Sequence, residues 1–277
     1  MNRREFLTGA AALAAVSGCR CPLCGEKRKL VAAQLWNLNK VFWDDPAKYL
    51  TALKAAGFDG VEFAGFGKAG AKPPTAKEIR RLLADAGLRG AGSHMTGKAN
   101  FTGDGLERNL DFCAEAGIES FTCAHYGAPD RAGWDDFIAF ISAAADEGAA
   151  RGIPVSFHNH FSEFEQKFGS ETVWDYVFRR ASKNLCQQVD TSQAIKCGID
   201  PVELLERYSG RNWCVHIKEN YPMAKRPNDP TTPVNLKAVA DYCKADPCLR
   251  WFILEDEREP TGLGATIALA KKFLPLV

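Results

Sequence analysis

The residues best suited to chemistry in this sequence are its histidines and three acids that follow apolar segments. Each of the five histidines lies at the end of a segment that predicts a β-strand: His94, His125, His158, His160 and His216. The acids occupy equivalent places: Glu62, Asp190 and Glu255. If the strands run parallel, their ends meet at one edge, where imidazole and carboxylate groups can hold a divalent metal ion. Taken singly, His94 or His125 is better explained by packing, but five of five at strand ends favours a site.

The segment from Val189 to Asn220 shows how two of these groups are expected to meet. It reads as an apolar run ending in Asp190, a helix, and a second apolar run carrying His216. Because side chains alternate along a strand, His216 and Lys218 should face the same side. With Glu255 from a later strand, Asp190 and His216 are predicted to ligate one metal ion and to leave an open coordination position.

The elements that must position these groups alternate along the chain. Apolar runs predict eight strands, at 30–36, 60–65, 88–94, 120–125, 154–160, a run ending at 190, a run carrying 216, and 250–255. Helical patterns alternate with them, at 45–57, 75–86, 104–116, 134–151, 171–181, from 200 onward, 235–244 and 261–273. About 250 residues in this order predict an α/β fold of the (β/α)₈ TIM-barrel type, a single domain over 30–277. A doubly wound open sheet is disfavoured, because the first strand–helix turn, 37–46, has no glycine-rich phosphate loop.

The first residues of the chain have the pattern of an export signal. Arg3-Arg4-Glu5-Phe6-Leu7 precedes the small apolar run GAAALAAVSG, which resembles a twin-arginine signal. Val16-Ser17-Gly18-Cys19 resembles a lipoprotein cleavage box. We therefore expect a signal peptide over 1–18, a lipidated Cys19, a linker over 19–29, and a periplasmic or membrane-anchored protein. The apolar stretch is about 12 residues, shorter than the roughly 20 that a transmembrane helix needs.

The remaining cysteines give no clear chemistry. Cys21 and Cys24 form a CxxC with no second pair nearby, so a zinc or redox motif, a disulfide and a simple tether all stay open. Seven others lie in predicted strands and helices, where a small buried apolar residue is the usual interpretation: Cys113, Cys123, Cys186, Cys197, Cys214, Cys243 and Cys248.

Composition limits the class of partner. The chain has 35 basic and 34 acidic residues and a net charge of +1. This balance gives no electrostatic reason to expect nucleic acid, and a metal-dependent DNA-repair nuclease would need a basic groove. We expect a small carbohydrate or polyol, with membrane contact only through the lipid anchor.

Several segments, in order, resemble the xylose-isomerase-like sugar isomerase/epimerase family, in particular the branch that carries an HNHxxEF motif. They are GVEF, GIPVSFHNHFSEFE, QQVDTSQAIKCGIDPVELLERYSGR, VHIKEN and WFILEDE, and the resemblance covers the chain after residue 29. It implies a divalent ion held at the ends of strands five to eight, commonly by Glu, Asp, His and Glu. The last three fall on Asp190, His216 and Glu255, and the first falls on His158. Because His158 replaces an acid, a mechanism with two metal-bound glutamates does not carry over intact.

The other candidate residues have open roles. Glu255, His160 and Glu163 are candidate bases, and His160 is expected on the same strand face as His158, where it could also be a ligand. Lys218 could donate to a substrate oxygen or be a surface lysine. The candidate substrate-binding residues are Trp36, Glu62, His94 and His125, of which Glu62 could instead fix a neighbouring histidine.

The function expected from this pattern is an exported, metal-dependent sugar isomerase or epimerase. Proton removal beside a carbonyl produces an enediolate, which one divalent cation stabilises by several kcal/mol; Mn, Zn, Co and Fe all suit a mixed N/O site. A keto-sugar dehydratase or glycoside lyase would use the same site. A lipid-anchored sugar-binding protein without catalysis is the alternative of another class. Outside the cytoplasm, a free or keto-modified sugar is a better expectation than a sugar phosphate.

Overall fold

Eight parallel strands close into a barrel in the computed structural model, which describes residues 28–38, 40–67, 70–219, 234–258 and 262–277. The strand order around the barrel is β1-β10-β9-β8-β5-β4-β3-β2. Their bounds are β1 Leu30–Gln34, β2 Gly60–Phe63, β3 Arg89–Thr96, β4 Phe121–His125, β5 Val155–His158, β8 Cys186–Asp190, β9 Asn212–Ile217 and β10 Trp251–Leu254. The predicted TIM barrel is confirmed.

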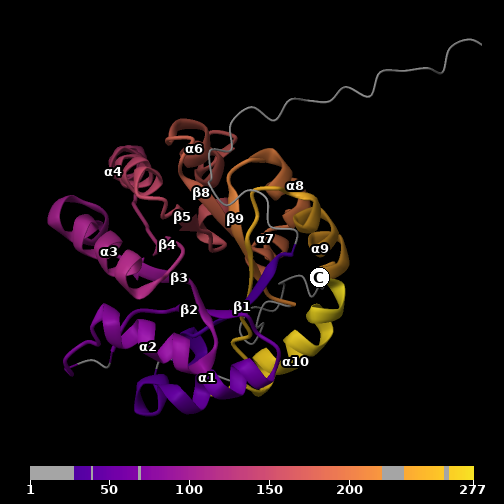
Figure 1. The fold of residues 1–277 in the computed structure, drawn as a ribbon. Helices are drawn as coiled ribbons and strands as arrows, with labels where there is room; N and C mark the ends of the chain where they lie inside the picture. Colours follow the sequence, from indigo (N-terminus) through magenta and orange to yellow (C-terminus); the bar gives the residue numbers. More distant parts are fainter. Residues whose placement is uncertain (1–27, 39, 68–69, 220–233, 259–261) are drawn as a thin grey trace, which may run out of the picture.

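Helices surround the strands on the outside (Figure 1). The α-helices are α1 Pro46–Ala55, α2 Ala76–Ala86, α3 Gly103–Ala116, α4 Arg131–Ala150, α5 Ser162–Glu165, α6 Val173–Arg180, α7 Thr191–Lys196, α8 Pro201–Arg207, α9 Leu236–Ala245 and α10 Gly264–Phe273. Short 3₁₀ turns lie at Trp36–Leu38, Phe42–Asp44, Lys98–Phe101 and Leu274–Leu276. Local sequence explains the ends of α2: Thr75 and Glu78 form a capping box, and Gly87 takes the left-handed conformation at φ 63°.

Three local features differ from the sequence-based expectation. Strand β5 ends at His158, so His160 lies on the connection after the strand and not on its face. That connection continues through α5 and a small hairpin, β6 Lys167–Phe168 and β7 Glu171–Thr172. An additional helix, α7, begins directly after β8, because the side chain of Asp190 accepts hydrogen bonds from the first backbone N–H groups of that helix.

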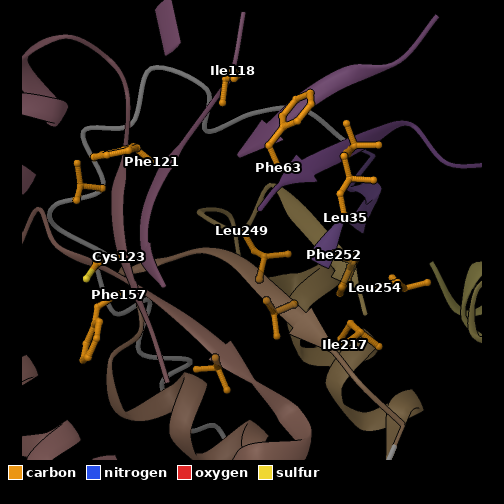
Figure 2. Close-up of a cluster of buried hydrophobic side chains, with 14 of the residues drawn as sticks. Leu35, Phe63, Ile118, Phe121, Cys123, Phe157, Ile217, Leu249, Phe252 and Leu254 are labelled. Atoms are coloured by element: carbon orange, nitrogen blue, oxygen red, sulfur yellow. The ribbon is translucent and has the colours of Figure 1, made fainter. Parts of the chain in front are cut away.

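The apolar side chains form two cores. The larger one lies between the strands and the helices, and Figure 2 shows part of it, with Phe63, Phe157 and Phe252 projecting from three different strands. A smaller one includes Trp251, Cys214 and Ile253. The indole of Trp251 packs against Gly60, where an added Cβ would lie 2.9 Å from the ring.

The Arg211 side chain, at the amino end of β9, forms hydrogen bonds with the segment before β8. Its guanidinium donates to the carbonyl oxygens of Phe178, Ser182 and Leu185 at 2.6–2.9 Å. Burial lowers the pKa of Arg211 to about 10, still well above neutrality. These bonds give the Phe178 and Leu185 carbonyls a donor and add a second donor at Ser182, whose carbonyl also accepts the Leu185 N–H.

The predicted signal peptide, Cys19, Cys21 and Cys24 lie outside the described residues. Within the part of the chain that the structure describes, no helix is both long and apolar enough to cross a membrane.

Candidate metal centre and active site

Three of the predicted metal ligands lie together at the carboxyl rim of the barrel. Asp190 ends β8 and pairs in register with His216 of β9, and Glu255 directly follows β10 and donates its N–H to the carbonyl of Ile217. One ligand atom of each lies within 4.8 Å of the others, and His216 Nδ1 is 3.2 Å from Glu255 Oε2. All three side chains are buried.

The two carboxylate oxygens of Asp190 have different roles: one caps a helix and the other faces the candidate site. Oδ1 accepts hydrogen bonds from the backbone N–H groups of Ser192 and Gln193 and from the Ser192 hydroxyl. Oδ2 is buried and accepts no well-directed hydrogen bond, although the Lys218 ammonium lies 3.0 Å away. The oxygen is therefore fixed in place, and beyond its ion pair with Lys218 it can offer a lone pair to a metal ion.

Lys218 places its ammonium among three carboxylates. Nζ lies 3.0 Å from Asp190 Oδ2, 3.1 Å from Glu255 Oε2 and 3.0 Å from Glu257 Oε1. Burial disfavours the charged amine, but the three acids outweigh it and hold the pKa of Lys218 well above its usual value. With 4% of the residue exposed, Lys218 is a buried ammonium and not a surface lysine.

The surrounding charges shift the neighbouring pKa values. Burial lowers the pKa of His216, but Glu62 and Glu255 outweigh it and raise that pKa to about 9. Burial raises the pKa of Glu255, yet Lys218 and His216 hold it below its usual range. Burial also raises the pKa of Glu257. At neutral pH, Glu255 is thus an anion held between two cations.

Glu62 is the centre of a buried hydrogen-bond network below the rim. Oε2 accepts from Gln34 Nε2 at 2.5 Å, from His216 Nε2 at 2.6 Å, and lies 3.1 Å from His94 Nε2. Oε1 accepts from Gln188 Nε2 at 2.8 Å. Burial raises the pKa of Glu62, but the nearby His94 and His216 outweigh it and leave the pKa lowered. These contacts account for Glu62 without a substrate.

The strand beside Glu62 leaves room for this network. Gly92 pairs with Glu62 in register, and a Cβ at that position would lie 2.8 Å from Glu62 Oε1. A side chain there would displace the carboxylate, so the glycine is needed for the close approach.

Gln188 links Glu62 to two further histidines. Its Oε1 lies 2.6 Å from His94 Nε2 and 2.9 Å from His158 Nδ1. His158 Nε2 is 3.8 Å from Asp190 Oδ2, while nitrogens of His158, His94 and His216 lie within 4.8 Å of one another. Burial lowers the pKa of both His94 and His158, which are therefore neutral at pH 7.

A second cluster lies beside the first and contains His125, His160 and Glu163. Glu163 accepts the His160 backbone N–H at 2.7 Å and the Ser162 hydroxyl at 3.0 Å. Burial raises the pKa of Glu163 to about 7 and lowers that of His160 to about 4. His160 Nδ1 is buried without a hydrogen-bond partner. The His160 ring contacts those of His158 and His125, with centroids 5.1 and 5.3 Å apart.

Sequence reasoning found most of this rim but missed its connecting residues. Gln188 lies two positions before Asp190 on β8, so strand alternation could have indicated it, whereas Glu257 lies beyond the end of β10, where alternation does not apply. Gln34 carries no such signal. Trp36, predicted to contact substrate, is 54% exposed just beyond β1.

The donor set fits a divalent metal ion. Metal–ligand bonds of about 2.0–2.1 Å place tetrahedral ligand atoms roughly 3.3 Å apart, close to the 3.2 Å between His216 Nδ1 and Glu255 Oε2. Asp190 Oδ2, buried without a directed donor, supplies a further oxygen. A mixture of imidazole nitrogen and carboxylate oxygen suits Zn, Mn, Co or Fe.

The fold and the rim cluster define a TIM barrel whose polar site lies at the carboxyl ends of its strands. The chain belongs to the Xylose isomerase-like TIM barrel family, whose profile matches residues 50–273. No curated protein matches the chain.

Several solved structures share the fold. A sugar phosphate isomerase/epimerase from Parabacteroides distasonis is 19% identical, with a TM-score of 0.69, covering 89% of this chain and 94% of that one. An AP endonuclease of family 2 from Brucella melitensis is 20% identical, with a TM-score of 0.63 and coverage of 86% and 97%. A D-allulose 3-epimerase from Methylomonas sp., in complex with D-allulose, is 15% identical, with a TM-score of 0.64 and coverage of 90% and 96%. At this identity the likeness shows the fold.

Proposed function

We propose that the protein is an exported, divalent-metal-dependent sugar isomerase or epimerase that transfers a proton beside a carbonyl. The observation that carries the proposal is the convergence of Asp190, His216 and Glu255 on one point of the rim, next to the Lys218 ammonium. The family supports it, as does the likeness to proteins described as a sugar phosphate isomerase/epimerase and a D-allulose 3-epimerase.

The chain's own residues can divide the chemistry among them. A divalent ion held by Asp190, His216 and Glu255, with His158 as a fourth ligand, would polarise a carbonyl and make the adjacent C–H more acidic. Glu255, ionised at neutral pH, is positioned to accept that proton, and Lys218 to stabilise negative charge on a substrate oxygen. Glu163, with its pKa of about 7, can exchange a proton near neutrality, and His160 lies beside it.

The charge of the rim favours a free sugar over a sugar phosphate. In the described residues, the charges of Asp190, Glu255 and Glu257 balance those of Lys218 and a divalent ion, so the rim has no excess positive charge to attract a phosphate group. Trp36 is exposed and offers an apolar surface for a sugar ring, and His94 and His125 offer polar contacts.

One observation favours elimination as a second candidate reaction. Epimerisation needs proton transfer on both faces of one carbon, whereas His158 stands where the family commonly has a second metal-bound glutamate. A single carboxylate, Glu255, is sufficient for a proton shift on one face or for loss of a β-substituent. A keto-sugar dehydratase or glycoside lyase would therefore use the same site.

The export part of the proposal is supported by sequence motifs. Arg3-Arg4 with the following apolar run resembles a twin-arginine signal, and Cys19 follows a lipoprotein-like box. Metabolic labelling with a fatty acid, compared between the full chain and Cys19→Ala, tests the anchor, and label retained by the variant contradicts it.

Metal analysis and solvent deuterium test the enzymatic proposal. Purified protein should hold about one divalent ion at the proposed centre, and Asp190→Ala should lose both the ion and turnover. Asp200→Ala, which removes an exposed helix cap outside the site, is the matched control and should retain both. Keto-sugars and keto-glycosides incubated in heavy water should gain deuterium beside the carbonyl.

The outcomes separate the alternatives. Inversion at the labelled carbon indicates epimerisation, label at the neighbouring carbon indicates isomerisation, and an unsaturated product indicates elimination. Sugar binding without turnover under any metal indicates a binding protein. Turnover without solvent label refutes proton transfer, and an Asp190→Ala variant that keeps its ion refutes the ligand set.

A further inference from the structure

Two buried residues outside the ligand set, Glu62 and Gln188, form hydrogen bonds with three of the histidines at the site. The donors and acceptors in this network can be assigned from Gln34 onward. Gln34 Oε1 accepts the backbone N–H groups of Leu35 and Trp36 at 2.7 and 3.2 Å. Since those N–H groups can only donate, the Gln34 oxygen is identified, and its NH₂ must face Glu62.

The next step concerns the ring of His216. The Glu62 carboxylate accepts and cannot donate, so the 2.6 Å contact to His216 Nε2 requires a proton on that nitrogen. Glu255 Oε2, 3.2 Å from Nδ1, is also a carboxylate, so Nδ1 carries a proton in the metal-free protein. Because Nε2 stays protonated against Glu62, Nδ1 is the nitrogen that releases its proton and presents a lone pair to an ion. Nδ1 is the atom that faces Glu255, on the side of Asp190 and the rim.

The same reasoning passes through Gln188 to the other two rings. Gln188 donates from Nε2 to Glu62 Oε1, so its carbonyl oxygen faces His94 and His158. An amide oxygen only accepts, which places protons on His94 Nε2 and His158 Nδ1. His158 therefore keeps its lone pair at Nε2, the nitrogen that lies 3.8 Å from Asp190 Oδ2.

We infer that Glu62 and Gln188 are positioning residues that select histidine tautomers, so that His216 offers Nδ1 and His158 offers Nε2 to a metal ion. His94, with its Nε2 proton donated to Gln188, keeps its lone pair at Nδ1. The part concerning the ion, including the choice of nitrogen at His216, rests on the proposed function, whereas the tautomers of His94 and His158 are properties of the chain alone.

The inference accounts for the exchange of an acid for His158. An imidazole can replace a carboxylate ligand only if the correct nitrogen lacks a proton, and an ordered partner on the other nitrogen secures this. Removing such a partner typically lowers metal affinity by about 10–100-fold.

The test uses ¹⁵N-histidine labelling, because the chain has only five histidines. In metal-free protein at pH 7, ring-nitrogen spectra should show His158 protonated at Nδ1 and His94 at Nε2. Gln188→Leu should abolish this preference and lower the affinity for Mn²⁺ or Zn²⁺, measured by calorimetry, about 10–100-fold. Gln188→Glu, which keeps an accepting oxygen, should retain the His158 tautomer.

The neighbouring residue provides a matched control for folding. Gln187 is equally buried, but its side chain donates to Asn212 and to two helix carbonyls, and within the described residues it forms no hydrogen bond with a histidine. Gln187→Leu should therefore keep both the tautomers and the affinity, even where its melting temperature falls as much as that of Gln188→Leu.

The possible outcomes test the tautomer selection and the metal centre separately. Unchanged tautomers in Gln188→Leu, or equal metal affinity in Gln187→Leu and Gln188→Leu, overturn the inference. If the wild-type protein binds neither ion, yet its tautomers depend on Gln188, the proposed metal centre fails and the tautomer selection stands.

Discussion

Replacing Lys218 by methionine removes a buried charge while keeping the length of the side chain. The ammonium contacts Asp190, Glu255 and Glu257 at 3.0–3.1 Å, and the lysine is 4% exposed. Without it, two fully buried carboxylates lose their nearest cation. Breaking a buried ion pair from one side costs about 3–5 kcal/mol, because the remaining charge is left unpaired.

The loss of stability in Lys218→Met should depend on whether a metal ion is bound. One kcal/mol shifts the melting temperature of a protein of this size by about 2–4 °C, so metal-free Lys218→Met should melt roughly 6–20 °C below wild type. A divalent ion present at 100 times its dissociation constant raises the free energy of unfolding by about 2.7 kcal/mol. The ion and the ammonium approach the same oxygens, so the variant should bind Mn²⁺ or Zn²⁺ more tightly than wild type and gain more stability from it.

Circular dichroism melts at pH 7.5, after chelation and then with added ion, measure both effects. Lys272→Met is the control, because Lys272 pairs with Glu219 at 2.7 Å on the exposed surface and should lose at most about 1 kcal/mol with no metal dependence. The reasoning is refuted if metal-free Lys218→Met melts with wild type, or if added ion raises both melting temperatures equally.

Three further variants probe the fold and its pH dependence. Arg211→Met should cost about 2–3 kcal/mol in denaturant unfolding, because the Phe178 and Leu185 carbonyls lose the guanidinium donor while Ser182 keeps the Leu185 N–H. Burial raises the pKa of Asp175, but hydrogen bonds from Tyr208 and Arg207 outweigh it and leave the pKa lowered. The ionised carboxylate therefore stabilises the fold above pH about 4, and this stabilisation is lost as the pH falls further. Asp175→Asn should lower the free energy of unfolding by about 1–2 kcal/mol at pH 7 and by less at pH 3. Burial raises the pKa of Glu163 to about 7, so the wild-type protein loses stability as the pH rises from about 4.3 through 7. Between pH 5 and pH 8, the stability of Glu163→Gln measured in urea should therefore rise by up to about 3 kcal/mol relative to wild type. A stability difference that stays constant with pH contradicts this prediction.

The barrel and its rim were predictable because their signals are local. Short apolar runs alternating with helical periods require only the residues of each run, and Asp190, His216 and Glu255 stand where such runs end. The boundary after β5 was less predictable, since Asn159 and His160 continue the sequence pattern of the strand while the chain turns away at His158. The helix after Asp190 was missed because its start depends on how that carboxylate is oriented.

The sequence by itself determined which chemical groups reach the carboxyl end of the barrel. Only the tertiary structure decided their partners, because Glu62 and His216 lie 154 positions apart and on strands that are not neighbours. Their contact depends on the closure and stagger of the strands, which set what meets across the interior. The same closure places Lys218 between its acids and Gln188 between two histidines, and no local pattern in the sequence specifies such contacts.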